Sequence, residues 1–122
     1  MKNLISIVEI PTTDFSRAIT FYKSVLNVDF EEIDMDGTIM GIFLSEEEGT
    51  NVCLIKDEHI QPSADGTMVY FNTKTDLQPV LDKVEPNGGK VILSKTEISP
   101  DMGFFALFLD TEGNKIGLHS PN

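Results

Sequence analysis

Tryptophan is absent from this chain of 122 residues, and cysteine occurs only once. Without tryptophan, no indole ring is available to stack on a flat aromatic ligand, and the phenylalanines replace it only in part. The single cysteine, Cys53, excludes an intrachain disulfide and is typical of a reducing compartment. We therefore expect a cytoplasmic protein.

Positive charge is also scarce. Nine Lys and Arg residues stand against 20 Asp and Glu residues, which gives a net charge of −11. Nucleic acids and anionic membranes would be repelled, so neither is expected as a partner. A cationic ligand would be attracted, although an acidic surface more often only keeps a protein soluble. No apolar run approaches the length of a membrane span, and the N-terminal residues do not resemble a secretory signal.

The length predicts a single domain over residues 1–122. Residues 4–10 are apolar and β-branched, which predicts a strand buried on both faces and ended by Pro11. Asp14 can cap a following helix, whose apolar stripe consists of Phe15, Ala18, Ile19, Tyr22 and Leu26. Three more strands are predicted at 29–35, 38–45 and 51–56, with turns around 36–37 and 46–51.

The same order then repeats after a polar linker at about 57–66. A strand is predicted at 67–73, and Asp76 can cap a second helix that carries Pro79 in its first turn. The final strands are predicted at 90–94, 104–109 and 114–119, with a hairpin turn at 110–114. The chain therefore contains two βαβββ modules, at about 1–56 and about 67–122, and neither is large enough to bury its sheet alone.

The chain resembles the vicinal oxygen chelate superfamily, which includes glyoxalase I, bleomycin resistance proteins and extradiol dioxygenases. Three stretches carry the resemblance: VEIPTTDFSRAITFYKSVLNVDF (8–30), VEPNGGKVI (84–92) and GFFALFLDTEGNKIGLHS (103–120). The resemblance implies an α+β fold in which two βαβββ modules pair into a curved, cup-like sheet with the helices outside. It also implies a small-molecule ligand in the cup and a homodimer, and it specifies the fold better than the reaction.

Metal-using members of the family carry their ligands at four strand positions. By motif, with Asp14 laid on Asp76, these positions correspond to Ile7, Cys53, Val69 and Gly117. Three of the four lack a donor atom, whereas a divalent metal needs at least three converging donors. We therefore expect no cofactor and no usual metal site. A shift of two residues in the alignment would bring in Glu9 and His119, so a relocated divalent metal stays open.

Glu9 and His119 are the candidate catalytic residues. Strand alternation predicts that Ile5, Ile7 and Glu9 point into the cup, while Val8 and Ile10 face the helix. If Glu9 is enclosed there, desolvation would raise its pKa towards a range useful for proton transfer; a glutamate that simply reaches solvent at the strand end is equally compatible. His119 shares a face with Gly117 and could exchange a proton near neutral pH, or it could be a satisfied rim histidine.

The predicted ligand-binding residues are Ile7, Cys53, Phe71, Met102 and Phe104. Cys53 and the Met and Phe side chains are residue types that more often pack in a core. Laying Asp14 on Asp76 places Phe71 in the cup, and it places Tyr70 and Asn72 under the second helix or at a dimer seam.

Two classes of function follow. In the first, the protein is a glyoxalase-like lyase or isomerase without the usual metal, in which Glu9 takes a proton next to a carbonyl and His119 is the acid or the orienting partner. In the second, the cup sequesters a cationic drug without catalysis, as bleomycin resistance proteins do. A module that binds a protein partner and keeps only a vestigial cup is a third interpretation.

Overall fold

The structure, a computed structural model, describes residues 4–44 and 49–122, so part of the turn expected at 46–51 lies outside the described residues. Within these residues the elements follow the predicted order of two βαβββ modules. They are β1 (Ile7–Pro11), α1 (Phe15–Leu26), β2 (Phe30–Met35), β3 (Thr38–Phe43), β4 (Asn51–Lys56), β5 (Tyr70–Asn72), α2 (Gln78–Leu81), a 3-10 helix η1 (Glu85–Asn87), β6 (Lys90–Ser99), β7 (Gly103–Leu109) and β8 (Lys115–Ser120).

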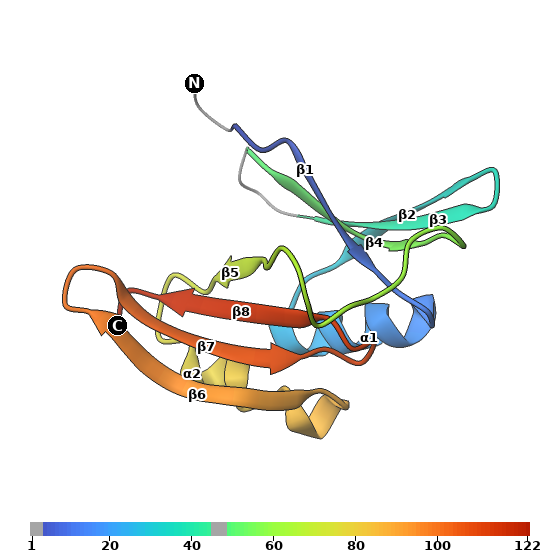
Figure 1. Ribbon diagram of the computed structural model, residues 1–122. Helices are drawn as coiled ribbons and strands as arrows, with labels where there is room; N and C mark the ends of the chain where they lie inside the picture. The colour runs from blue at the N-terminus through green and yellow to red at the C-terminus, as the bar shows by residue number, and fades with distance from the viewer. Residues whose placement is uncertain (1–3, 45–48) are drawn as a thin grey trace.

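The eight strands form two four-stranded sheets (Figure 1). Sheet 1 has the order β1-β4-β3-β2 and sheet 2 has the order β5-β8-β7-β6. In each sheet the first strand of the module pairs in parallel with the last, and the other pairs are antiparallel. The expected α+β class with two βαβββ modules is therefore confirmed, and the hydrogen bonding divides the strands equally between the modules.

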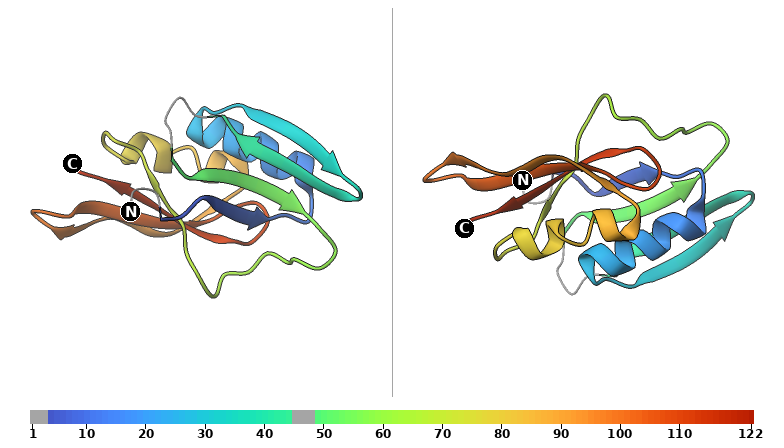
Figure 2. Two further views of the ribbon diagram at one scale, coloured as in Figure 1. Left: turned by 90° about the horizontal axis from the view of Figure 1, so that it is seen from above. Right: turned by 90° about the horizontal axis from the view of Figure 1, so that it is seen from below.

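Each sheet has one face covered by helices. In Figure 1, α1 lies below sheet 1 and α2 lies behind sheet 2, and Figure 2 shows the two helices side by side. Asp14 caps α1 by accepting a hydrogen bond from the backbone N–H of Arg17 at 3.1 Å, as predicted. The second helix is shorter than expected, since only Gln78–Leu81 are α-helical and Glu85–Asn87 form the separate 3-10 turn.

The core is one cluster that joins the two modules through α1. The predicted stripe of α1 is largely buried, but Phe21 and Val25 are buried as well. Phe21 packs against Phe108 of sheet 2 with ring centroids 6.0 Å apart. The helix therefore contacts both sheets, and this second contact buries a wider face than one amphipathic stripe predicts.

Strand β1 is buried on one face only, so the prediction of two buried faces was wrong. Ile10 is buried against the helix side, as expected. Ile7 is 60% exposed and Glu9 is exposed on the opposite face. The apolar run at 4–10 therefore places large side chains in solvent in the single chain.

The register of the internal repeat differs by one residue from the alignment that uses Asp14 and Asp76. Thr12 donates its backbone N–H and its hydroxyl to the carbonyl of Ile55, and Thr73 donates the same two groups to the carbonyl of His119. Thr12 and Thr73 are therefore equivalent, which makes Tyr70 the counterpart of Glu9. The second module has one more residue between Thr73 and Asp76 than the first has between Thr12 and Asp14, and Lys74 accommodates it with a positive φ of 67°. The predicted cap at Asp76 was wrong, because Leu77 is the N-cap of α2 and no side chain caps it.

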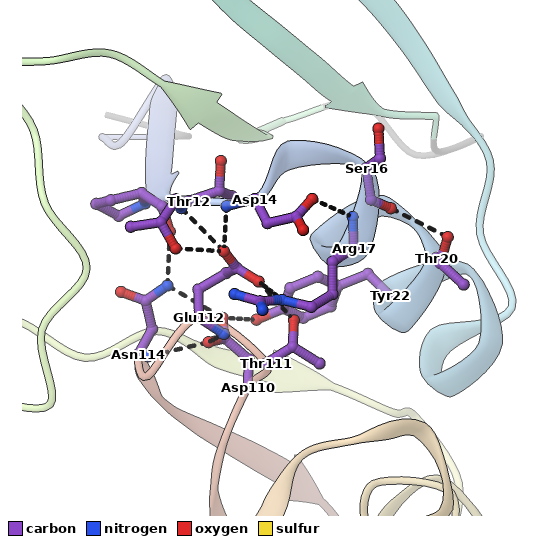
Figure 3. A network of polar contacts seen from close by, with 12 residues as sticks. Thr12, Asp14, Ser16, Arg17, Thr20, Tyr22, Asp110, Thr111, Glu112 and Asn114 are labelled. Carbon is purple, nitrogen blue, oxygen red and sulfur yellow. Dashed lines mark hydrogen bonds and ion pairs between the residues drawn. The ribbon is translucent and has the colours of Figure 1, made fainter.

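The hairpin turn between β7 and β8 fastens the second module to the start of α1 (Figure 3). The Glu112 side chain is fully buried there. Its carboxylate accepts hydrogen bonds from the backbone N–H groups of Thr13 and Asp14, at 2.9 and 2.7 Å, and from Arg17 Nε at 2.8 Å. Burial alone would raise the pKa of Glu112, but Arg17 and the other donors outweigh it and lower that pKa to about 2.

A second contact in Figure 3 joins the same hairpin to the buried face of α1. The Tyr22 hydroxyl donates a hydrogen bond to Asp110 Oδ2 at 2.6 Å, and Asn114 Nδ2 donates to the same oxygen at 3.1 Å. Burial, followed by the charge of Asp110, raises the pKa of Tyr22 well above its usual value. These polar contacts fix the two modules relative to each other.

Candidate functional site

The candidate site consists of the two sheet faces that no helix covers, called here the helix-free faces. On sheet 1 this face carries Ile7 and Glu9 from β1 and Cys53 from β4. On sheet 2 it carries Tyr70 from β5 and Gly117 and His119 from β8. The predicted alternation of β1 and β8 is therefore confirmed, because these residues lie on the face opposite Ile10 and Leu118 of the core.

Glu9 and Cys53 are direct neighbours on sheet 1, paired across β1 and β4. The Glu9 side chain is exposed, and its carboxylate makes no hydrogen bond or ion pair with any residue that the structure describes. Cys53 is only 1% exposed. Burial, followed by the charge of Glu9, raises the pKa of the Cys53 thiol, so this cysteine is a packed neutral group beside a free carboxylate.

Tyr70 occupies the corresponding position on sheet 2, where it pairs with Gly117. A β-carbon added to Gly117 would lie 2.3 Å from Cδ2 of the Tyr70 ring, so the ring lies over the glycine. The ring is 48% exposed and is 6.5 Å from that of Phe105. Sheet 2 therefore presents an aromatic surface where sheet 1 presents a carboxylate.

The expected orientation of β5 was wrong. Phe71 lies on the helix-covered side, where its ring stacks on Phe43 at 5.7 Å and contacts Tyr22 at 6.1 Å. Tyr70 and Asn72 lie on the helix-free face in place of Phe71. The cause is the extra residue at Lys74, since a shift of one residue moves every side chain of a strand to the other face.

Phe104 also differs from the expectation, because its side chain packs against the core rather than facing a ligand. The ammonium of Lys95 lies 4.6 Å from the centre of its ring. Met102 is 58% exposed at the end of the β6–β7 hairpin. A role for Met102 in ligand binding stays a prediction, as it does for Ile7 and Cys53.

His119 is positioned by the β6–β7 hairpin. Its Nε2 lies 2.6 Å from the carbonyl oxygen of Met102. A carbonyl only accepts hydrogen bonds, so Nε2 carries a proton and Nδ1 is the atom that can accept one from a ligand. Glu9 and His119 lie on different sheets, and no hydrogen bond or ion pair joins them in the described part of the chain.

The residues at the family's metal positions do not fit a divalent ion. Ile7, Val69 and Gly117 have no donor atom, and the Tyr70 ring fills the space into which a side chain at position 117 would project. Cys53 supplies a single buried sulfur. Among residues 4–44 and 49–122, no three His, Cys, Asp or Glu side chains lie close enough together to hold a metal ion.

With the fold and the geometry of these faces described, comparison with known proteins identifies the family. Residues 4–118 match the model of the Glyoxalase/Bleomycin resistance protein/Dioxygenase superfamily, and the chain belongs to this family. A glyoxylase-like domain-containing protein of Didymella fabae is 34% identical over 119 residues, covering 90% of this chain and 88% of that protein. A putative glyoxylase of Mycobacterium bovis, CFP32, is 29% identical, and this chain spans only 44% of its length.

Solved structures show the same fold. TnmS3, an antibiotic-binding protein from Streptomyces, is 20% identical with a TM-score of 0.73, and the match covers 97% of this chain and 95% of that one. The fosfomycin resistance protein FosX of Listeria monocytogenes is 15% identical with a TM-score of 0.70, covering 100% and 93%. None of the helices among the described residues is long and apolar enough to cross a membrane.

Sequence reasoning missed two features of this site. Tyr70 was placed on the wrong face, and only the matching hydrogen bonds of Thr12 and Thr73 reveal its equivalence to Glu9. The close approach of Tyr70 to Gly117 also has no local signal beyond the glycine itself. A glycine inside a strand does indicate that another group approaches the backbone closely, and this is the one sequence feature that pointed to it.

Proposed function

We propose that this protein binds a small organic molecule on its helix-free faces without a metal ion, and that Glu9 is the charged group that anchors the ligand. The observation that carries the proposal is the exposed carboxylate of Glu9, which has no partner among the described residues and lies beside the exposed side chain of Ile7. A carboxylate among apolar side chains can hold a cationic group while the apolar surface binds the rest of the ligand.

The proposal includes a homodimer. Leu4, Ile5 and Ile7 are 79%, 57% and 60% exposed in the single chain, and Tyr70 on sheet 2 is half exposed. Apolar side chains gathered at one site on a surface favour an interface or a ligand. A second copy that covers these residues would enclose the ligand between one copy's Glu9 and the other copy's Tyr70.

A cationic ligand suits the charge of the protein. The net charge is −11, and the polar groups of the two faces include the carboxylate of Glu9 and the hydroxyl of Tyr70. The exposed ring of Tyr70 can also attract a cation through its π face. TnmS3, which has the same fold, is an antibiotic-binding protein, and this supports a ligand of that kind. Sequestration of such a molecule in the cytoplasm, where the lone thiol stays reduced, is the function that the geometry supports best.

Proton transfer is the second candidate, as a lyase or isomerase of the glyoxalase type. It is favoured by the free carboxylate of Glu9 and by the names of the curated relatives, which are described as glyoxylases. Glu9 would remove a proton next to a carbonyl group, and Nδ1 of His119 would orient the substrate by accepting a hydrogen bond. Glu9 and His119 lie on different sheets, so both can act on one substrate only if the two helix-free faces come together, within one chain or between two chains.

The test compares Glu9→Gln with Glu97→Gln, an exposed glutamate on the helix-covered side of β6. The chelator-treated protein is screened by thermal shift with a polyamine and a cationic glycopeptide, and it is assayed with hemithioacetal substrates. A rise in melting temperature at low salt that is lost only in Glu9→Gln supports sequestration. Turnover that is lost only in Glu9→Gln supports the enzyme. Turnover that returns only when a divalent ion is added overturns the metal-free proposal.

A further inference from the structure

A cavity at the junction of the two modules is not used by the function proposed above. Its volume is about 530 Å³. One side is formed by the end of α1 and by β3 and β4, and the other by β5, the residues that follow it, and α2. This volume lies within the range of pockets that hold small organic ligands.

The floor of the cavity is aromatic and contains one ring from each module. Phe43 of β3 and Phe71 of β5 both line it, and their rings stack with centroids 5.7 Å apart and planes inclined by 18°. Leu26, Val52 and Val80 complete an aliphatic surround. A flat aromatic ring could pack on this floor, because aromatic rings favour offset-stacked and edge-to-face contacts with one another.

The rim of the cavity is polar and carries one available charge. Glu31 lines the rim and is exposed, and its carboxylate makes no hydrogen bond or ion pair with the described residues. Lys74 also borders the cavity, but it already has a partner within the chain. Asn51 and Asn72 add amide groups that can donate or accept hydrogen bonds. The rim therefore favours a positively charged head group.

We propose that this cavity binds an aromatic molecule that carries one amine cation, with its ring on the Phe43–Phe71 floor and its ammonium group at Glu31. The ligand would contact side chains from both modules at once. Because it would bind only when the junction is formed, it would stabilise the folded chain, and the stabilisation would grow with the logarithm of its concentration once the site is saturated. Glu9 does not line the cavity. The rim residues Glu31 and Asn72 belong to the edge strands β2 and β5, whose register places them on the helix-free faces at the mouth of the cavity.

The first experiment uses three probes that share one ring system. They are 1-naphthylmethylammonium, the neutral 1-naphthylmethanol and the anionic 1-naphthylacetate, titrated by calorimetry into the full chain at low salt. We expect the cation to bind on the order of fivefold tighter than the alcohol, which is the size of one exposed charge pair. The advantage should shrink at high salt. Equal affinity for all three probes, or binding of none, overturns the proposal.

The second experiment locates the bound cation with matched variants. Glu31→Gln should lower the affinity for the cation to that for the alcohol, whereas Glu32→Gln, on the next residue of β2 and outside the cavity, should not change it. Val80→Phe should fill the cavity and abolish binding of both probes; Leu26→Phe serves the same purpose if Val80→Phe does not fold.

Glu9→Gln separates this site from the proposed ligand site on the helix-free faces. If Glu9→Gln binds the cationic probe with unchanged affinity and the cavity-filling variant does not bind it, the probe binds in the cavity. This result supports the present proposal whatever the outcome for the function proposed above. If Glu9→Gln no longer binds the cationic probe while Val80→Phe still binds it, the probe binds at the helix-free face, and the proposal is overturned.

Discussion

The ring of Tyr70 lies over Gly117, in the space that a β-carbon at position 117 would need. We predict that Gly117→Ala destabilises the protein by about 1–3 kcal/mol, because the added methyl group overpacks against the ring and forces it to move. The measurement is the free energy of unfolding in urea.

A double-mutant cycle provides the control for this prediction. Removing the ring with Tyr70→Ala should relieve most of the penalty, so that Gly117→Ala has little effect in that background. Additive effects of the two substitutions would contradict the close approach.

Much of the fold follows from local signals in the sequence. The caps, turn glycines and apolar spacing around Asp14, Gly37 and Gly113 predicted the order of the elements, and Gly37 and Gly113 do adopt the positive φ values that such turns require. The length of the second helix was overestimated because its apolar spacing continues to Val84, whereas the α-helix ends at Leu81 and the 3-10 turn begins at Glu85.

The candidate site was less predictable, and the reason is one residue. The alternation along β1 and β8 placed Glu9 and His119 on the correct face without any tertiary information. On β5 the same reasoning failed, because laying Asp14 on Asp76 does not align the strands that precede them, and Lys74 accommodates the difference. The contacts of Glu112 join residues almost a hundred positions apart, and no local pattern encodes them.

Tyr22 supplies a prediction about the buried hydrogen bond to Asp110. Tyr22→Phe should destabilise the protein by about 2 kcal/mol, because it removes a hydrogen bond to a buried carboxylate that is left with fewer donors. Tyr70→Phe is the matched control, since its ring is half exposed, and it should change the free energy of unfolding by less than about 0.5 kcal/mol. Equal effects of the two substitutions would contradict a structural role for the Tyr22 hydroxyl.

The raised pKa of Tyr22 gives a separate prediction at alkaline pH. In a Tyr70→Phe background, the absorbance change of phenolate formation should report Tyr22 alone. Burial and the charge of Asp110 keep the folded phenol neutral, so its contribution to stability is complete below the unfolded pKa near 10 and is lost as the pH rises above it. Phenolate should therefore appear together with loss of the near-ultraviolet dichroism. Ionisation in a chain that remains folded at ordinary tyrosine pH would refute the burial.

Cys53 is expected to be unreactive in the folded protein. Its thiol is buried, and burial and the charge of Glu9 both raise its pKa, so little thiolate is present at neutral pH. Reaction with a disulfide reagent such as Ellman's reagent should be slow in buffer and fast in urea, at a rate set by opening of the chain. Labelling in buffer as rapid as that of a small free thiol would show that the helix-free face of β4 is open.

Glu112 makes the stability of the module junction dependent on pH. Its pKa of about 2 in the folded chain lies below the ordinary value of 4.5, so the unfolded state binds the proton more readily. The stabilisation is therefore complete above about pH 4.5 and is lost as the pH falls towards 2. The size of this stabilisation corresponds to about 3 kcal/mol. Glu112→Gln should lower the free energy of unfolding by about this amount at pH 7, and the difference from the unmodified protein should vanish near pH 2.

The control is Glu58→Gln, which replaces an exposed glutamate in the linker and should leave the free energy of unfolding unchanged at both pH values. A difference between Glu112→Gln and the unmodified protein that is unchanged from pH 7 to pH 2 would mean that the carboxylate charge does not hold the β7–β8 hairpin to α1.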